Sequence, residues 1–424
     1  MKLLVFAHTP PPHHGQSYMV KLMLDGLGGD CRGKSKDEGR RSKADPASRI
    51  PHPASPPIQC YHVNAQVSDN MEDIGTFRFG KLLLILRYCL EAIWCRFRYG
   101  VRAFYYVPAP GKRAALYRDW IVMLMCRPFF RHFIHHWHAV GLGDWLRSEA
   151  NWFERWLTNR LLGKPTLGLS LAVPSMRDAL WLRSGQVELV PNGIPDPCPD
   201  FETTVLPRRI ARLAARRALI AGENADASAN ENAGPDPEVF RVLFLANLLP
   251  DKGTFDAIEA VAIANAQLRA TNSRMRMHLT IAGALPVGAG DAKFRSRIAE
   301  PDIAGSVDWV GFVDGEKKTV LLRECDCLCF PSFYHAESFG LVVVEAMAAG
   351  MAIVTTRWRA LPDLLPASYP GLVPIRRPDM VAGKLIEAMS EDAARLRDEF
   401  IRRFKEPAHL ETLRDAILHL EAAA

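Results

Sequence analysis

The stretch HAESFGLVVVEAMAAG, residues 335–350, decides the fold of the C-terminal half. It follows CLCFPS, residues 327–332, an apolar run of strand length that ends at a proline. Gly340 opens an apolar helical pattern, so the sequence predicts a strand, a loop and a helix in that order. Glu337 is then expected in the loop and Glu345 about one turn inside the helix. The free N–H groups and the positive dipole at such a helix start can bind a diphosphate.

A second strand-loop-helix segment is FLANLLPDKG, residues 244–253. Here Lys252 precedes a helix that is expected to start near Thr254, and its ammonium can neutralise phosphate charge. The two carboxylates, Glu337 and Glu345, can accept hydrogen bonds from sugar hydroxyls. Simpler interpretations stay open: an acid that stabilises a helix start, a surface glutamate and a solvated loop lysine.

Short apolar runs alternate with helical patterns along the whole chain, which predicts parallel sheets covered by helices. The runs lie at residues 3–7, 60–63, 104–107, 133–137, 167–173 and 187–190, and again at 242–246, 279–282, 307–310, 327–330, 352–355 and 371–374. Helices are expected at residues 81–98 and 116–130. The predicted class is α/β, with two Rossmann-like doubly wound domains that face across a cleft where ligands bind beyond the carboxyl ends of the strands.

Composition divides the chain further. Residues 1–200 are expected to form the N-terminal domain, with a mobile insertion at 28–57 that lacks large apolar side chains. Residues 201–238 are expected to form a partly helical linker with a disordered centre around 223–230. Residues 239–405 then form the C-terminal domain. The last segment, 406–424, is expected to be a helix that packs back on the N-terminal domain.

The charge and the cysteines narrow the class of protein. The chain of 424 residues carries a net charge of +6, with the basic excess in the N-terminal half, which favours anionic partners or is a solvated basic surface. Residues 1–6 enter a strand directly, with no secretory signal, and residues 82–94 are too short and too charged to span a bilayer. The protein is therefore expected in the cytoplasm.

No metal site is expected. Cys325, Cys327 and Cys329 alternate like buried strand residues. The histidines between residues 132 and 138 lack the spacing of a metal site. No Asp-x-Asp triplet is present.

These motifs together resemble the retaining glycosyltransferases of family 4, which have the GT-B fold. The hallmark of that family is a pair of glutamates separated by seven residues, as at Glu337 and Glu345. Further similarities are Gly-Phe-Val at 311–313, CLCFPS at 327–332 and Pro-Asn-Gly-Ile at 191–194. The resemblance covers nearly the whole chain outside residues 28–57 and 215–237.

The resemblance implies roles for particular residues. Glu337, His138 and Lys252 would be catalytic: Glu337 and His138 near the transferred sugar, and Lys252 on the diphosphate. Donor-binding residues would be Gly15, Gln16, Asn247, Lys252, Val313, Glu337, Ser338, Phe339, Gly340, Leu341 and Glu345. Within that set Glu345 would bind the ribose. Backbone N–H groups near Phe339, Gly340 and Leu341 would bind the phosphates, and the loop with Val313 would lie against the base.

Two positions depart from the family pattern. Asn247 stands where an arginine usually precedes the lysine by five residues, and Gly15-Gln16 stands where Gly-Gly is common. One positive charge on the phosphate side is therefore missing. The family mechanism would be retention of configuration without a protein nucleophile, with the leaving phosphate acting as base. In the absence of an Asp-x-Asp triplet, Lys252 and the helix start would stabilise the leaving diphosphate without a metal.

Other functions remain open: a hydrolase that uses the two glutamates as acid and base, a nucleotide-sugar epimerase, and a binding protein with a decayed donor site. The expected partners are a nucleotide-sugar donor, which is a substrate and not a cofactor, and a lipid-linked or saccharide acceptor of cell-envelope glycan synthesis. No nucleic acid is expected. Basic residues of the N-terminal half alternate with aromatic ones, which suits the inner face of an anionic membrane or a buried core with solvated arginines. They are Arg87, Arg96, Arg98, Arg102, Lys112, Arg113, Arg118, Arg127 and Arg131, with Trp94, Phe97, Tyr99, Trp120, Phe129 and Phe130.

Overall fold

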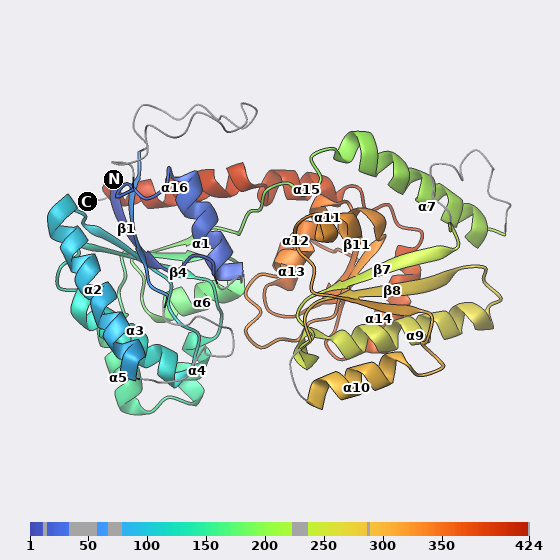
Figure 1. Cartoon of the computed structure of the whole chain (residues 1–424), viewed down its shortest axis with the longest axis horizontal. Helices are drawn as coiled ribbons and strands as arrows, with labels where there is room; N and C mark the ends of the chain where they lie inside the picture. Colours follow the sequence, from blue (N-terminus) through green and yellow to red (C-terminus); the bar gives the residue numbers. More distant parts are fainter. Residues whose placement is uncertain (12–14, 34–56, 67–78, 223–235, 286–288, 423–424) are drawn as a thin grey trace. The chain divides into compact units, whose positions relative to one another are not determined.

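The computed structural model describes the whole chain except residues 12–14, 34–56, 67–78, 223–235, 286–288 and 423–424 (Figure 1). Most of the predicted insertion at 28–57 and the predicted linker centre at 223–230 lie outside the described residues. The chain forms two compact units. Unit 1 comprises Met1–Asn192 and Pro407–Ala424, and unit 2 comprises Gly193–Glu406. None of the described helices is both long enough and apolar enough to cross a membrane.

Unit 1 is built on a parallel sheet in the order β2-β1-β3-β4-β5-β6. Its strands are β1 (Lys2–Ala7), β2 (Gln59–Asn64), β3 (Ala103–Tyr106), β4 (His132–Trp137), β5 (Leu167–Ser170) and β6 (Gln186–Leu189). Its helices are α1 (Gly15–Gly26), α2 (Phe79–Tyr99), α3 (Arg113–Cys126), α4 (Leu142–Ser148), α5 (Trp152–Leu161), α6 (Val173–Trp181) and α16 (Glu406–Ala422).

Both faces of this sheet are covered, which explains why its strands are apolar at successive positions. Leu3 and Val5 of β1 join a core with α1 and α16, whereas Leu4 and Phe6 join a core with α2 and α3. Side chains alternate across a strand, so neighbouring residues enter different cores. The C-terminal helix α16 thus packs in unit 1 through residues such as Leu413.

Unit 2 is also built on a six-stranded parallel sheet, with the different strand order β12-β11-β10-β7-β8-β9. Its strands are β7 (Val239–Leu245), β8 (Arg276–Ala282), β9 (Val307–Gly311), β10 (Cys327–Phe330), β11 (Ala352–Thr356) and β12 (Leu372–Val373). Its helices are η3 (Phe201–Val205), α7 (Leu206–Ile220), η4 (Pro250–Lys252), α9 (Thr254–Ala270), α10 (Ala289–Ile298), α11 (Gly315–Glu324), α12 (Leu341–Ala348), α13 (Leu361–Leu364), α14 (Pro378–Ala388) and α15 (Leu396–Arg403). Figure 1 shows α9 and α14 on one face of the sheet and α11 and α12 on the other.

Two expected boundaries change. The run predicted as a strand at 167–173 ends at Ser170, because Val173-Pro174 begins α6, where a proline is tolerated in the first helical turn. Residues 201–220, expected in the linker, form η3 and α7 and are part of unit 2. The buried side chains of Arg212 and Arg216 fix α7 in place, since both form ion pairs with the buried Asp326.

The predicted α/β class is confirmed: every apolar run of the two predicted series contains a strand of one of the two sheets. In unit 2 the strands β7 and β10 are neighbours in the sheet. The chain continues from β7 to β8 on one side of this pair and from β10 to β11 on the other side. Ligands of open parallel sheets bind beyond the carboxyl ends of the two strands at such a reversal. The strands β7 and β10 therefore mark the place in unit 2 where a ligand site is expected.

Candidate active site

The loops that follow β7 and β10 are joined to each other at this edge of unit 2. The backbone N–H of Phe333 donates to the carbonyl oxygen of Asp251 at 2.8 Å. The loop after β10 is also tied to the end of β11, where Trp358 Nε1 donates to the carbonyl oxygen of Tyr334 at 2.7 Å and the Thr356 hydroxyl donates to that of Ser332. These bonds give the polar side chains at the strand ends a defined position.

The centre of the site is an ion pair between Lys252 and Glu337. Lys252 Nζ lies 2.8 Å from Glu337 Oε2, and the Ser332 hydroxyl donates to the same carboxylate oxygen at 3.0 Å. The Glu337 side chain is only 7% exposed, so its charge is largely removed from water and depends on these two donors. The structure therefore brings together two of the residues predicted to be catalytic.

Aromatic rings surround the lysine ammonium. Lys252 Nζ lies 4.4 Å from the centre of the Tyr334 ring and 5.7 Å from that of Phe330. Burial raises the pKa of the Tyr334 hydroxyl, and the carboxylates of Asp251 and Glu337 raise it further. The phenol is consequently a neutral hydrogen-bond donor beside the lysine, available to an anionic ligand.

Two glycines allow the loops to turn into helices beside the ion pair. Gly253 precedes α9 with φ +82°, and a Cβ atom there would lie 2.3 Å from the carbonyl oxygen of Pro331. Gly340 precedes α12 with φ +86°, and its Cβ would lie 2.7 Å from Leu361 Cδ2. Only glycine adopts this positive φ readily and also lacks the Cβ atom that these positions cannot accommodate. The N-termini of α9 and α12 thus both begin at the edge where Lys252 and Glu337 meet.

The second glutamate belongs to a separate ion pair. Glu345 lies in the second turn of α12 and accepts a hydrogen bond from Lys318 Nζ of α11 at 2.7 Å. Its side chain is 13% exposed and that of Lys318 is 32% exposed. Glu345 is therefore held beside the loop that connects β9 to α11, which is the Gly-Phe-Val loop.

The other predicted donor residues of unit 2 differ in exposure. Phe339 is buried, whereas Ser338, Leu341 and Val313 are partly buried in the loops and first turn around the ion pairs. Phe312, next to Val313, has 65% of its surface exposed. Asn247, two residues beyond β7, is exposed, and its carbonyl oxygen accepts a hydrogen bond from the backbone N–H of Leu249 at 2.7 Å.

The predicted residues of unit 1 form a different arrangement. Gly15 and Gln16 begin α1, with Gly15 exposed and Gln16 partly buried. His138 directly follows β4 and is 9% exposed, with its ring centre 4.2 Å from that of His136. His136 Nδ1 lies 2.6 Å from the Tyr105 hydroxyl, and burial keeps the pKa of His136 well below its usual value. These residues are in unit 1, so the structure does not place them against the unit 2 site.

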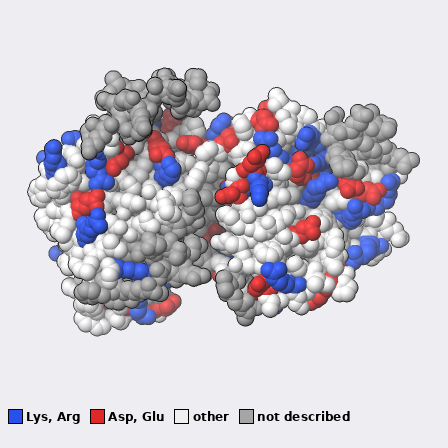
Figure 2. Space-filling view, in the orientation of Figure 1, with Lys and Arg blue, Asp and Glu red and all other residues white. Residues whose placement is uncertain are grey.

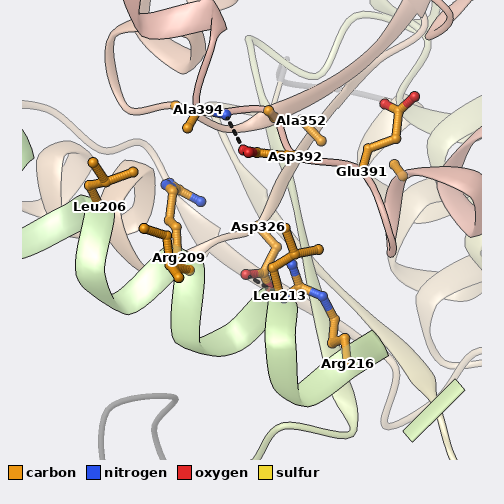
Figure 3. Close-up of a pocket in the computed structure, with 13 residues that line it drawn as sticks. Leu206, Arg209, Leu213, Arg216, Asp326, Ala352, Glu391, Asp392 and Ala394 are labelled. Atoms are coloured by element: carbon orange, nitrogen blue, oxygen red, sulfur yellow. Dashed lines mark hydrogen bonds and ion pairs between the residues drawn. The ribbon is translucent and has the colours of Figure 1, made fainter. Parts of the chain in front are cut away.

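A small cavity of unit 2 lies at the opposite edge of the same sheet, between α7 and the starts of β10 and β11 (Figure 3). Its volume is about 30 Å³, enough for a water molecule but not for a nucleotide. Arg209 donates to the carbonyl oxygens of Leu322, Cys325 and Ala349, and so caps the C-terminal ends of α11 and α12. This arginine-lined cavity is therefore part of the attachment of α7.

Comparison with known proteins identifies the family of unit 2. Residues 227–406 match the model of the family "Glycosyl transferases group 1". Unit 2 belongs to the group 1 glycosyl transferases. The resemblance predicted from the glutamate pair is thereby confirmed. A relative of this group 1 domain is the phosphatidyl-myo-inositol mannosyltransferase of Mycolicibacterium smegmatis, 37% identical over 126 residues, which are 30% of this chain and 32% of that protein. The match thus spans about a third of the length of this curated relative.

Solved structures resemble this chain over its full length. Sucrose-phosphate synthase from Thermosynechococcus elongatus aligns with a TM-score of 0.63, covers 100% of both chains and is 17% identical. The Anabaena protein HepE, in complex with UDP and glucose, aligns with a TM-score of 0.60, covers 99% of this chain and 100% of its own, and is 14% identical. These similarities establish the predicted GT-B fold.

Three residues of the site were missed from the sequence. Ser332 was noted only as the end of a strand, although its hydroxyl binds Glu337. Tyr334 and Lys318 gave no signal, because a tyrosine in a loop and one of two adjacent lysines on a helix are ordinary surface residues. Their roles depend on which loops the sheet brings together, and the spacing within one segment does not encode that.

Proposed function

We propose that this protein is a glycosyltransferase that moves a sugar from a nucleoside diphosphate sugar to an acceptor, with retention of configuration and without a metal ion. The observation that carries the proposal is the Lys252–Glu337 ion pair at the reversal of the unit 2 sheet, between two helix N-termini. A diphosphate is attracted by the ammonium and by the helix N-termini, and a carboxylate accepts hydrogen bonds from a sugar.

Binding of the donor would exchange the partners of this ion pair. Lys252 would turn to the diphosphate, and Glu337 would accept hydrogen bonds from the hydroxyls of the transferred sugar while it keeps Ser332. Glu345, held by Lys318, would bind the ribose, and the exposed ring of Phe312 would lie beside the base. Lys252, the Tyr334 hydroxyl and the start of α12 would then stabilise the charge that develops on the leaving diphosphate.

The proposed acceptor is a lipid-linked or saccharide intermediate of cell-envelope glycan synthesis, used at the cytoplasmic face of a membrane. Its support is the name of the mycolicibacterial relative, which specifies a phosphatidyl-inositol acceptor, and the basic and aromatic composition of unit 1. His138 would lie near the transferred sugar and the acceptor. Gly15 and Gln16 would approach the phosphates from unit 1.

The test is a hydrolysis assay with the full chain and a panel of nucleotide-sugars. Release of nucleoside diphosphate from one donor, in the presence of a chelator, supports a metal-independent enzyme, and an NMR spectrum of the product gives the anomeric configuration. Binding of a donor without any turnover, with or without acceptor extracts, would instead favour a binding protein. Release of a free epimerised sugar nucleotide would favour an epimerase.

A further inference from the structure

A basic cavity lies in unit 1 at the edge of the sheet where its strands begin. It has a volume of about 290 Å³, and its lining includes Lys2, Arg102, Arg131 and His132. Arg102 directly precedes β3 and Arg131 directly precedes β4, and the two strands are parallel neighbours of one sheet. The fold therefore brings to one place cationic residues that are far apart in the sequence.

Among the described residues, the lining of this cavity carries positive charge only. No Asp or Glu belongs to the described lining, and within the described chain the guanidinium groups of Arg102 and Arg131 have neither an ion pair nor a hydrogen bond. The Lys2 ammonium is held by the carbonyl oxygen of Tyr99 at 2.9 Å, which leaves its charge uncompensated. Close cations repel each other, so an anion that binds between them gains charge-assisted hydrogen bonds from several donors.

The cavity is distinct from any substrate site at the other edge of the sheet. Substrates of open parallel sheets bind beyond the carboxyl ends of the strands, whereas this cavity opens at their amino ends. We infer that it binds the phosphate group of an anionic ligand, and that the source of this phosphate is the headgroup of a membrane lipid.

The lipid source is supported by exposed aromatic side chains beside the cavity. Tyr99, the last residue of α2, directly precedes Gly100 of the cavity lining. The ring of Trp94 packs against that of Tyr99, with 5.5 Å between the ring centres, and Trp94 is 53% exposed. Phe97 is 68% exposed and contacts Phe129, which is two residues from Arg131. Tryptophan and phenylalanine beside basic residues are typical of protein surfaces that lie in the interface of an anionic bilayer.

The helix α2 carries more basic than acidic residues. The single carboxylate of α2, that of Glu91, accepts a hydrogen bond from Arg32 at 2.6 Å, while Arg87 and Arg98 of the same helix are exposed. Figure 2 shows Lys and Arg side chains at the corner of unit 1 where α2 ends near the chain termini of Figure 1. Of the aromatic residues that the sequence suggested for a membrane surface, Phe130 is buried in the core and Tyr99 and Trp120 are partly buried against it.

The anion site does not depend on the proposed glycosyltransferase activity, whereas the lipid source deepens that proposal. The test uses the full chain and the double variant Arg102→Gln/Arg131→Gln. The matched control is Arg177→Gln/Arg183→Gln, which removes the same charge from exposed positions in α6 and in the turn after it. The measurements are flotation with phosphatidylcholine vesicles that contain or lack phosphatidic acid, and the melting temperature in inorganic phosphate against chloride at equal ionic strength.

The wild type and the control are expected to float with the phosphatidic acid vesicles, and the cavity variant to bind them about tenfold more weakly because two charge-assisted contacts are lost. Equal losses in the cavity variant and the control would overturn the site, because the attraction would then be spread over the whole surface. Unchanged binding by the cavity variant would overturn it as well. A third outcome separates the two parts of the inference. If inorganic phosphate stabilises the wild type and the control but not the cavity variant, and no protein binds vesicles, the anion site is supported and the lipid source is overturned.

Vesicle flotation and the melting temperature in phosphate do not depend on whether the protein uses a nucleotide-sugar donor. An intact response to phosphatidic acid in a protein that hydrolyses no nucleotide-sugar would remove the proposed function and leave the anion site. The melting temperature of each variant without phosphate serves as the control for folding, and none of the four substituted residues belongs to the candidate active site.

Discussion

The carboxyl edges of the two sheets hold different side chains. In unit 2 the strand ends hold paired charges, Lys252 with Glu337 and Lys318 with Glu345, and two glycine-initiated helices. In unit 1 the corresponding edge holds His138 beside the buried, neutral ring of His136. Both sheets have six parallel strands, but the strand orders differ. The unit 2 edge offers charged side chains beside two helix starts, whereas the two histidines at the unit 1 edge are buried and one of them is held neutral.

The largest effect is expected from breaking the central ion pair of unit 2. Lys252→Ala removes the cation from a buried carboxylate and from the proposed diphosphate, and Glu337→Gln keeps the shape but removes the charge. Each is expected to lower donor turnover tenfold or more, which corresponds to about 1.5–3 kcal/mol of charge-assisted hydrogen bonds. Steady-state kinetics measure the loss, with Lys317→Ala, an exposed lysine of α11, as the control. Normal turnover in both variants would contradict the site.

A smaller effect is expected at the start of α12. Gly340→Ala places a Cβ atom 2.7 Å from Leu361 at a φ of +86°, so it is expected to lower the free energy of unfolding by about 1–2 kcal/mol and to weaken donor binding. Gly383→Ala is the matched control, because Gly383 lies inside α14 with no atom within 4 Å of the added Cβ. The control is expected to be neutral or stabilising, since alanine favours a helix. Urea denaturation distinguishes them, and equal stabilities would mean that the helix start tolerates a side chain.

The pH dependence of stability tests the neutral state of the two buried histidines of β4. Burial lowers the pKa of His135 to about 3, and burial also holds that of His136 well below its usual value. Below about pH 6.5 the unfolded chain binds protons at these histidines and the native state does not. The contribution of the neutral histidines to the free energy of unfolding is therefore fully present above that pH and decreases as the pH falls. Each histidine is expected to lower the free energy of unfolding by about 1 kcal/mol between pH 6.5 and 5.5.

The variant His135→Leu sharpens this prediction. Both ring nitrogens of His135 are buried without a hydrogen-bond partner in the described part of the chain. The leucine is therefore expected to keep or raise stability at pH 7.5 and to flatten the loss on acidification, as measured by urea denaturation at several pH values. An unchanged slope would show that His135 is protonated in the native state.

The smallest effect is expected from the second ion pair of unit 2. Lys318 positions Glu345, whose side chain is 13% exposed, so Lys318→Ala leaves the carboxylate free to move. Donor affinity is expected to fall about threefold to fivefold, with little change in the maximal rate, because the contact with the ribose is made equally in the ground and transition states. Calorimetric titration and kinetics measure the two quantities, with Lys317→Ala again as the control. A fall in the rate alone would contradict a positioning role.

Hydrophobic periodicity predicted the fold of this chain well, because inner strands such as β1, β3 and β10 are buried and apolar at successive positions. The pair Lys252 and Glu337 was also predicted, since both residues follow a strand and precede a helix. The partners Ser332, Tyr334 and Lys318 were not, because their positions depend on contacts between loops from different strands. The helix α7 was assigned to a linker since its arginines suggest a solvated surface, whereas Arg212 and Arg216 are buried against Asp326.

The central claim, that the unit 2 site holds a nucleoside diphosphate sugar, is tested most directly by a thermal-shift screen of the full chain against a nucleotide-sugar panel. A ligand that binds only the folded state raises the melting temperature. The account predicts that one donor raises it in the wild type and in Lys317→Ala, and that Lys252→Ala loses most of this shift. A panel in which no nucleotide-sugar changes the melting temperature, or one in which Lys252→Ala responds as the wild type does, would contradict it.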